Sequence, residues 1–327
     1  MEPGGGGDAS QISAPRVDSS GYATWDCIWF GSYWQGDTNG DGQCFAKDTT
    51  VIKKDDGHFY DRDDQTAHIY NFDGEEGFYP ADDKQPIKWR VLGFDSDGYA
   101  ILLADRILEA KEFNTEEKEV KWDSSTLRAY LNGYSSGSNT EGIDYTDKGF
   151  INEAFTQKER IQLIDKGLST PSNPVYGTEG DTWPRYDWVT ILSAQESTNS
   201  AYGFYMNEYI KTTLTSSTQN DMTDSDPNRV ALDTSYVANL VGYRMRRDKT
   251  DEKGGGDELW WLRTPGYDTT RACTVNRNGC TRVYGSSVYE DLIGVRPVIH
   301  LLLSSARNYW TYAGTVTADY GPDTGFK

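Results

Sequence analysis

The chain has 327 residues, with 32 Lys and Arg against 51 Asp and Glu, which gives a formal net charge of -19. A protein that binds nucleic acid by neutralising phosphates needs the opposite charge, and no apolar run is long enough for a membrane span. Aromatic residues make up 13% of the chain, enough for a folded core. We therefore expect a folded protein with no nucleic-acid partner and no membrane span.

Residues 1–21 open with MEPGGGGDAS and contain no apolar segment of the kind that a signal peptide has. We interpret them as a flexible lead.

The aromatic segment WDCIWFGSY at residues 25–33 predicts the first strand. Residues 87–94 and 99–103 predict two further strands, and the DSDG between them predicts a hairpin turn.

An acidic loop follows the first predicted strand. Calcium takes six to eight oxygen ligands, and a loop supplies them from its positions 1, 3, 5, 7 and 12 when glycine at position 6 permits a tight turn. This spacing predicts a structural calcium site; an acidic surface turn is the alternative. The residues at the five ligand positions are Asp37, Asn39, Asp41, Gln43 and Asp48.

The middle of the chain carries signals for helix starts and ends. Residues 124–132 predict a helix with Asp123 or Ser124 as its N-cap, and Gly133 predicts its end. A further helix is predicted at residues 233–242. Two capping boxes, Thr156 with Glu159 and Ser193 with Glu196, each predict a helix start, and the helix after the Thr156 box is predicted to end at Gly167.

Strand signals fill the last third, at residues 259–265, in a hairpin within 271–284, and at 294–303. Strands at both ends with helices between them predict an α+β domain whose mixed, mostly antiparallel sheet brings the two ends close together. Because there is no internal repeat or linker, we predict a single domain over residues 22–305, followed by a tail over 306–327.

The chemistry-bearing residues are scattered. The four cysteines form no CxxC pair, and the three histidines belong to no HExxH or acidic cluster. This pattern disfavours metal-hydrolase and triad chemistry. Cys273 and Cys280 are close enough in sequence to leave one catalytic alternative open, a thiol pair around a soft metal such as copper.

The segment from residue 267 to 291, called the window below, has the composition of a recognition surface. It is rich in Tyr, Arg, Ser, Asn and Gly, and its charges sum to zero on a strongly acidic chain. Val275, Val283 and Val288 can point into a core. This leaves the side chains of Arg277 and Tyr284, among others, for solvent. An ordinary exposed hairpin is the alternative interpretation.

Several segments together resemble a bacterial and phage domain family: FGSYWQ, IKWRVLG, STLRAYLNG, INEAFT, LWWLRTPG and GVRPV. The carboxy-terminal half is similar to the variable proteins of diversity-generating retroelements, of the subtype whose fold is like that of formylglycine-generating enzymes. The resemblance implies a C-type lectin fold with a constant framework and a window rewritten by mutagenic reverse transcription. The chain continues about thirty residues past GVRP, whereas many variable proteins end soon after it.

Rewriting at template adenines can turn an Asn codon into fifteen residues, but never into Glu, Lys, Gln, Met or Trp. Of these five types, only Glu290 occurs in the window. The resemblance also assigns roles. The framework residues are Trp260, Trp261, Leu262, Arg263, Gly294, Val295, Arg296 and Pro297. The ligand-contacting residues are Tyr267, Asp268, Thr269, Thr270, Arg271, Cys273, Asn276, Arg277, Asn278, Cys280, Arg282, Tyr284, Ser286, Ser287, Tyr289 and Glu290.

We therefore expect a non-catalytic ligand-binding protein for receptor recognition or adhesion, whose window contacts a protein or glycan on another cell or surface. The virion or cell surface is the favoured location, and a monomer the favoured state. Two alternatives remain: a formylglycine-generating-enzyme-like thiol oxidase, and a calcium-dependent structural or adhesive module in which the window has no special role. Fold similarity by itself does not decide among them.

Overall fold

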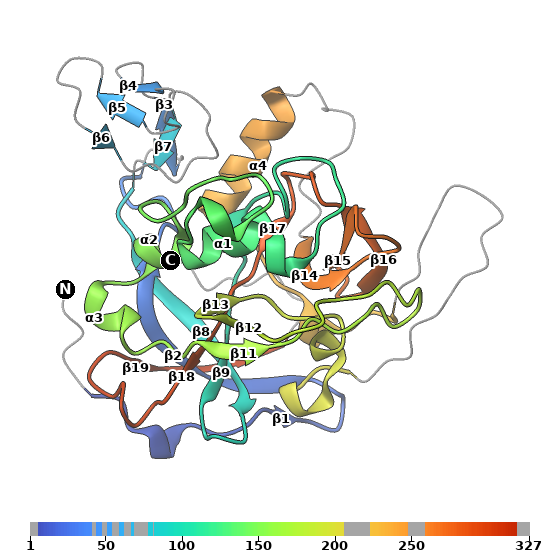
Figure 1. Ribbon diagram of the computed structural model, residues 1–327. Helices are drawn as coiled ribbons and strands as arrows, with labels where there is room; N and C mark the ends of the chain where they lie inside the picture. The colour runs from blue at the N-terminus through green and yellow to red at the C-terminus, as the bar shows by residue number, and fades with distance from the viewer. Residues whose placement is uncertain are drawn as a thin grey trace.

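A computed structural model describes residues 6–40, 44–47, 51–53, 59–61, 67–68, 78–80, 82–205, 223–247 and 259–318. Within these residues the chain forms an α+β arrangement of short helices and mostly antiparallel strands (Figure 1). This agrees with the fold class expected from the sequence.

The largest sheet contains segments from both ends of the domain. Its strands lie in the order β1 (Arg16–Val17), β2 (Ala23–Tyr33), β8 (Gln85–Phe94), β9 (Ala100–Ala104), β18 (Val298–Leu301) and β13 (Val189–Thr190), and β19 (Thr311–Thr317) also pairs with β2. The predicted hairpin of β8 and β9 is confirmed. Its turn forms because the Asp95 carboxylate accepts hydrogen bonds from the backbone amides of Asp97 and Tyr99.

Residues 6–21 and 306–318 belong to the folded domain, which corrects the predicted flexible lead and tail. β19 pairs antiparallel with β2, and Trp310, just before β19, is fully buried. At the other end, the Gly7 amide donates to the Arg307 carbonyl oxygen at 2.8 Å. The prediction failed because β19 is half-exposed and carries no apolar run. The expectation that the strands near the two ends meet in one sheet is confirmed.

The second sheet carries the window. It has five strands among the described residues, in the order β10 (Glu109–Ala110), β17 (Gly294–Val295), β14 (Trp260–Pro265), β15 (Arg271–Val275) and β16 (Thr281–Ser287). β14, β15 and β16 are antiparallel neighbours, and β14 runs parallel to β17. The two framework segments are therefore adjacent in space, and the window forms the outer part of the sheet.

The helices are short and begin at identifiable caps. α1 (Thr126–Asn132) is capped by Ser125, one residue after the predicted position, and ends at Gly133, whose φ of 62° suits glycine. The capping box of Thr156 and Glu159 is confirmed, but α3 (Gln157–Arg160) is shorter than predicted. The remaining helices are α2 (Phe150–Ala154), α4 (Ser235–Arg247) and the 3-10 turns Ala9–Gln11, Trp122–Ser124, Ser136–Ser138, Glu196–Thr198, Ser200–Tyr202 and Pro227–Arg229.

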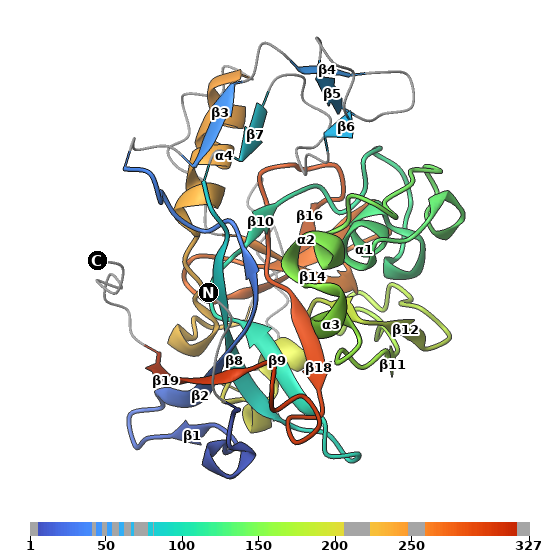
Figure 2. The same cartoon turned by 90° about the vertical axis from the view of Figure 1, so that its left-hand side faces the viewer.

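Smaller strand groups complete the structure. β11 (Lys166–Leu168) pairs with β12 (Arg185–Asp187), and β3 (Phe45–Lys47) pairs with β7 (Phe78–Pro80). β4 (Val51–Lys53), β5 (Phe59–Asp61) and β6 (Ala67–His68) form a three-stranded group. Both views place α4 beside the β3–β7 pair (Figure 2).

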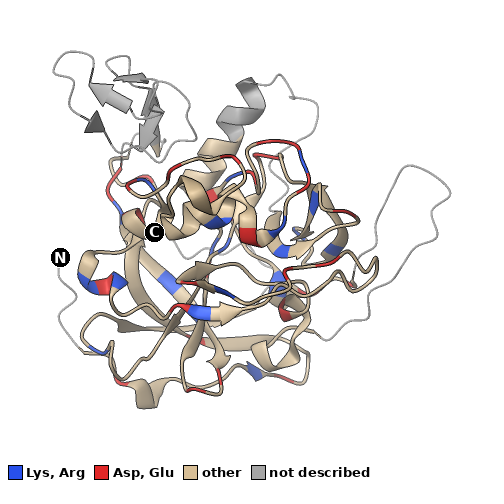
Figure 3. Cartoon of the chain, viewed as in Figure 1, with Lys and Arg blue, Asp and Glu red and all other residues tan. Residues whose placement is uncertain are grey.

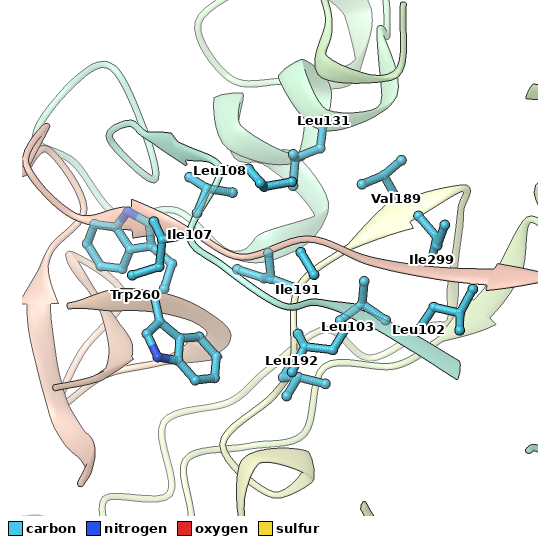
Figure 4. Close-up of a cluster of buried hydrophobic side chains, with 14 of the residues drawn as sticks. Leu102, Leu103, Ile107, Leu108, Leu131, Val189, Ile191, Leu192, Trp260 and Ile299 are labelled. Atoms are coloured by element: carbon cyan, nitrogen blue, oxygen red, sulfur yellow. The ribbon is translucent and has the colours of Figure 1, made fainter. Parts of the chain in front are cut away.

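The main core joins the two sheets and the helices. Leu103 from β9, Ile299 from β18, Leu131 from α1 and Trp260 from β14 are fully buried, and Figure 4 shows them in one cluster. Burying one such side chain stabilises the fold by about 1.5–3 kcal/mol. This core fixes the position of β14, from which the window begins.

A buried carboxyl group lies beside this core. Glu109, on β10, accepts hydrogen bonds from the hydroxyl groups of Tyr33 at 2.8 Å and Tyr130 at 3.2 Å, and from the backbone amide of Ala110 at 3.0 Å. Its burial outweighs these bonds and raises the pKa of Glu109 to about 7. The buried Lys111 side chain, placed over the Tyr130 ring, lies close by.

Candidate ligand-binding surface

The β15–β16 hairpin separates buried from exposed side chains by the period of a strand. In β16, Thr281 and Val283 are buried, whereas Arg282 and Tyr284, which alternate with them, are half-buried. The predicted inward positions, Val275, Val283 and Val288, are all fully buried. The hairpin therefore presents one set of side chains to solvent while the other set holds it on the domain.

Most of the predicted contact residues reach the surface. The exposed or half-buried ones are Tyr267, Asp268, Thr269, Thr270, Arg271, Asn276, Arg277, Asn278, Arg282, Tyr284, Ser286, Ser287, Tyr289 and Glu290. Two of these have a local structural use: the Asp268 carboxylate accepts from Thr270, and the side-chain oxygen Oδ1 of Asn276 accepts from the backbone amides of Asn278 and Cys280. Both side chains close turns at the two ends of β15.

The structure corrects the prediction that Cys273 and Cys280 contact a ligand. Cys273 is 0% exposed and Cys280 is 8% exposed, so neither presents its thiol to a ligand. Cys273 lies beside the carbonyl oxygens of Pro265 and Val283, whereas Cys280 lies in the turn after Asn276. Burial raises the pKa of both thiols. The two cysteines fill space in the hairpin as small apolar residues.

A bulge in β16 brings two window tyrosines together. The register between β15 and β16 shifts between Ala272 and Thr274, where Gly285 has a φ of 81°. A Cβ atom at Gly285 would lie 2.5 Å from the Ala272 carbonyl oxygen, so only glycine fits. The bulge allows the Tyr267 amide to donate to the Tyr284 carbonyl oxygen at 2.9 Å.

Three tyrosines and one arginine form a cluster at this point, which we call the tyrosine cluster. The rings of Tyr267 and Tyr284 stack with centroids 5.4 Å apart and an interplanar angle of 24°. Tyr176 approaches Tyr267 edge-on at 4.9 Å, and the Arg271 guanidinium lies 4.8 Å from the Tyr284 ring centroid. Tyr267 remains 51% exposed. The cluster is a rigid, amphipathic surface of the type that anchors binding partners.

The loop that supplies Tyr176 comes from outside the window. Asn173 is 3% exposed, and its side-chain amide donates to the carbonyl oxygens of Pro265 and Val283, both at 2.8 Å. Its own oxygen accepts from the backbone amides of Val175 and Tyr176 at 3.0 Å. One buried side chain thus fixes this loop against β14 and β16.

Sequence reasoning missed Asn173 and Tyr176. The segment TPSNPVYG has a turn signature around Asn173, but a turn does not indicate which distant strand it contacts. No local periodicity could have placed Tyr176 beside Tyr267, about ninety residues away.

The outer turn of the hairpin is fixed by a second buried side chain. Arg229 is 0% exposed and donates to the carbonyl oxygen of Gly279, and also to the Ser197 carbonyl oxygen at 3.2 Å. Gly279 has a φ of 72°, and a Cβ atom there would collide with the Asp226 backbone. The turn that displays Arg277 and Asn278 therefore has a fixed conformation.

The framework residues are buried, as the resemblance implies. Trp260, Trp261 and Arg296 are 0% exposed. The Arg296 guanidinium donates to the Ala104 carbonyl oxygen at 2.8 Å, and its Cζ atom lies 5.2 Å from the Trp260 ring centroid. Arg263 pairs with Glu196, donating from Nη2 to Oε1 at 2.8 Å, and this pair lowers the pKa of Glu196.

The predicted calcium loop is described only in part. Asp41, Gln43 and Asp48 lie outside the described residues. Asp37 accepts a hydrogen bond from the Gly40 amide at 2.6 Å, and Oδ1 of Asp82 accepts from the amides of Thr38 and Asn39 at 2.8 and 3.2 Å. Among the described residues, no group of three or more His, Cys, Asp or Glu side chains is arranged to hold a metal ion.

A family model described as "Domain of unknown function (DUF6273)" matches residues 97–303, which is more than half of the chain. The chain belongs to this DUF6273 family. The match covers the helices, both framework segments and the window, but it ends before β19 and begins after β8. Searches of curated proteins and of solved structures give no match.

In the part of the chain that the structure describes, none of the helices has the length and apolar character that crossing a bilayer requires.

Proposed function

We propose that this protein is a non-catalytic ligand-binding protein with a C-type lectin fold, and that its window is a variable surface for receptor recognition or adhesion. Its partner is a protein or glycan on another cell or surface, which places the protein on a virion or outside a cell, acting as a monomer. The observation that carries this proposal is the tyrosine cluster, which joins two window tyrosines, Arg271 and the fixed residue Tyr176 on one exposed surface.

The alternation of burial in the hairpin supports a surface that can be rewritten. Substituting an exposed side chain changes the free energy of unfolding by about 0.5 kcal/mol or less, so many window sequences are compatible with one fold. The buried residues Ala272, Val275, Val283 and Val288 retain the packing that holds the hairpin in place. Affinity then depends on a few anchors, since a minority of interface residues carries most of the binding energy.

The thiol-oxidase alternative has less support. Thiol chemistry uses the thiolate, and burial disfavours the thiolate form of Cys273 and Cys280. The two side chains also have different neighbours within the hairpin. Replacing both cysteines with Ser should therefore leave ligand binding intact.

Comparison of sibling copies of this gene tests the proposal. We expect differences to concentrate between residues 267 and 291 and, within this window, at the exposed positions such as Tyr267, Arg277 and Tyr289. The buried positions Ala272 and Val283 should stay apolar. Differences spread evenly along the chain, or concentrated at buried window positions, would refute a variable surface.

A structural calcium site in the loop from Asp37 to Asp48 is a second proposal. Beyond the ligand spacing, one observation favours it: Oδ2 of Asp82 is buried and has no hydrogen-bond partner among the described residues, next to the backbone of Thr38 and Asn39. A hundredfold excess of calcium over its Kd should stabilise the protein by about 2.7 kcal/mol. Thermal unfolding with calcium and with chelator measures this, and equal melting temperatures would exclude the site.

A further inference from the structure

We propose that the β15–β16 hairpin recognises an acidic peptide segment of a protein partner, with Arg271 as the residue that binds a carboxylate. This inference rests on the proposed binding function and specifies the chemistry of its ligand. The first argument is charge. Residues 271–287 contain three arginines, Arg271, Arg277 and Arg282, and no Asp, Glu or Lys, on a chain whose net charge is -19. Figure 3 shows the basic segments on β15 and β16.

The orientation of Arg271 is the second argument. Its guanidinium lies over the Tyr284 ring, 4.8 Å from the centroid, and its one hydrogen bond among the described residues is a long contact of 3.5 Å to the Gly285 carbonyl oxygen. Arg271 forms no ion pair with any residue that the structure describes. A guanidinium held by stacking, with one long hydrogen bond to the backbone and no ion pair among the described residues, is suited to bind a carboxylate through two parallel hydrogen bonds.

The acidic residue next to Arg271 in the sequence, Asp268, does not supply the carboxylate that Arg271 would bind. The Asp268 carboxylate accepts from the backbone amide of Thr270 at 3.0 Å and from its hydroxyl group at 2.6 Å. These bonds hold the carboxylate within the turn that precedes β15. The carboxylate that pairs with Arg271 is therefore expected to come from a partner.

The surroundings favour a peptide over a sugar polymer. Tyr267 and Tyr284 are rigid anchors beside the small polar residues Ser286 and Ser287, a composition typical of protein-binding surfaces. Arg282 and Tyr284 lie on the same face of β16, because buried Val283 separates them. From Arg271 to Val275 the strand β15 covers about 13 Å, the length of an extended segment of about four residues.

Selection from a displayed library of random peptides tests the inference. The full-length protein is the target, and a parallel selection uses the Arg271→Gln variant. We expect peptides selected by the wild-type protein to be enriched in Asp and Glu, and their affinity to fall as salt rises. Arg271→Gln should weaken them about tenfold, and Arg271→Lys should not restore binding, because lysine lacks the planar, bidentate donor edge.

Arg307→Gln is the matched control, since it removes the same charge from an exposed arginine outside the window. Equal weakening by Arg271→Gln and Arg307→Gln would overturn the inference, because net charge alone would then explain binding. Arg277→Gln, at an exposed turn position, provides a second variant that cannot disturb the core; we expect it to weaken binding about threefold.

Three other outcomes would also overturn the inference. Selected peptides could be neutral or basic, or no peptide could be selected. In a separate arm, oligogalacturonate could bind in an Arg271-dependent manner while peptides do not, which would identify an acidic glycan as the ligand. These outcomes leave the proposed function standing, since the variation of the window among sibling genes is measured independently.

Discussion

The framework segments and the hairpin are neighbours in one sheet, yet their side chains have opposite environments. Trp260 and Arg296 are fully buried, with the Arg296 guanidinium over the Trp260 ring, whereas Tyr267 and Arg277 face solvent. The two regions share backbone pairing through β14 and β15. The comparison teaches that one sheet can carry buried side chains that hold the fold beside exposed side chains that contribute little to it, and the proposed recognition surface depends on this separation.

The largest expected effect comes from truncating a buried side chain of the framework. Trp260→Ala should lower the free energy of unfolding by about 3–5 kcal/mol, because it leaves a cavity in the shared core. Urea denaturation measures the change. The matched control is Trp183→Ala, at a tryptophan that is 71% exposed, which should cost about 0.5 kcal/mol or less. Similar losses at the two positions would contradict the assignment of stability to the framework.

The second effect is the pH dependence contributed by Glu109. Its folded-state pKa is about 7, above the ordinary 4.5, so the native state retains a proton that the unfolded state has released. The favourable contribution is complete below about pH 4.5 and is lost as the pH rises through about 7, a change of about 3 kcal/mol. Glu109→Gln should remove this dependence and stabilise the protein at pH 8.

Measuring the stability of the variants across pH separates the contribution of Glu109 from that of the other carboxylates. The stability of Glu109→Gln relative to wild type should rise between pH 5 and pH 8. Glu117→Gln changes an exposed glutamate and should give a flat difference. A flat difference for Glu109→Gln as well would show that the carboxyl group keeps an ordinary pKa within the core.

The third effect concerns the contact between the framework strand β14 and the hairpin. Asn173→Ala removes the amide that bonds to Pro265 and Val283 and leaves these buried carbonyl oxygens with only the weak thiol donor of Cys273, so we expect a loss of about 1–3 kcal/mol. Asn278→Ala, at an exposed position in the outer turn, should change stability little. Because Asn173 also positions Tyr176, its removal should weaken ligand binding without altering a window residue.

The sequence predicted the elements that have strong local signals. Aromatic and apolar segments bounded by turn residues located β2, β8, β9 and the window strands, and the reciprocal bonds of Thr156 with Glu159 confirm the predicted capping box. The helix after this box ends early because Leu163 bridges to Leu301, and the Ile164 amide donates to the His300 carbonyl oxygen. Contact with the sheet overrides the local helix propensity there.

The contacts between distant segments could not be predicted in the same way. Alternation in the window indicated that Tyr284 faces outward, and the resemblance placed Tyr267 among the contact residues. Neither indicated that Asn173 links Pro265 to Val283. Cys273 was misplaced because a cysteine is compatible with both surface and core, and only the register of the bulge decides between them. The burial of Glu109 was also invisible, since a single acidic residue in a sequence carries no sign of its environment.

The smallest expected stability effect is the most informative about the hairpin. The double variant Arg277→Ser and Tyr289→Ala changes two exposed window residues on separate turns, so each should shift the free energy of unfolding by about 0.5 kcal/mol or less, and the shifts should add. Thermal and urea unfolding measure the sum. The pair Val275→Ser and Val283→Ala, at buried positions of the same hairpin, is the control and should be strongly destabilising. If the exposed pair destabilised as much as the buried pair, the window would be part of the framework, and its sequence could not vary independently of the fold.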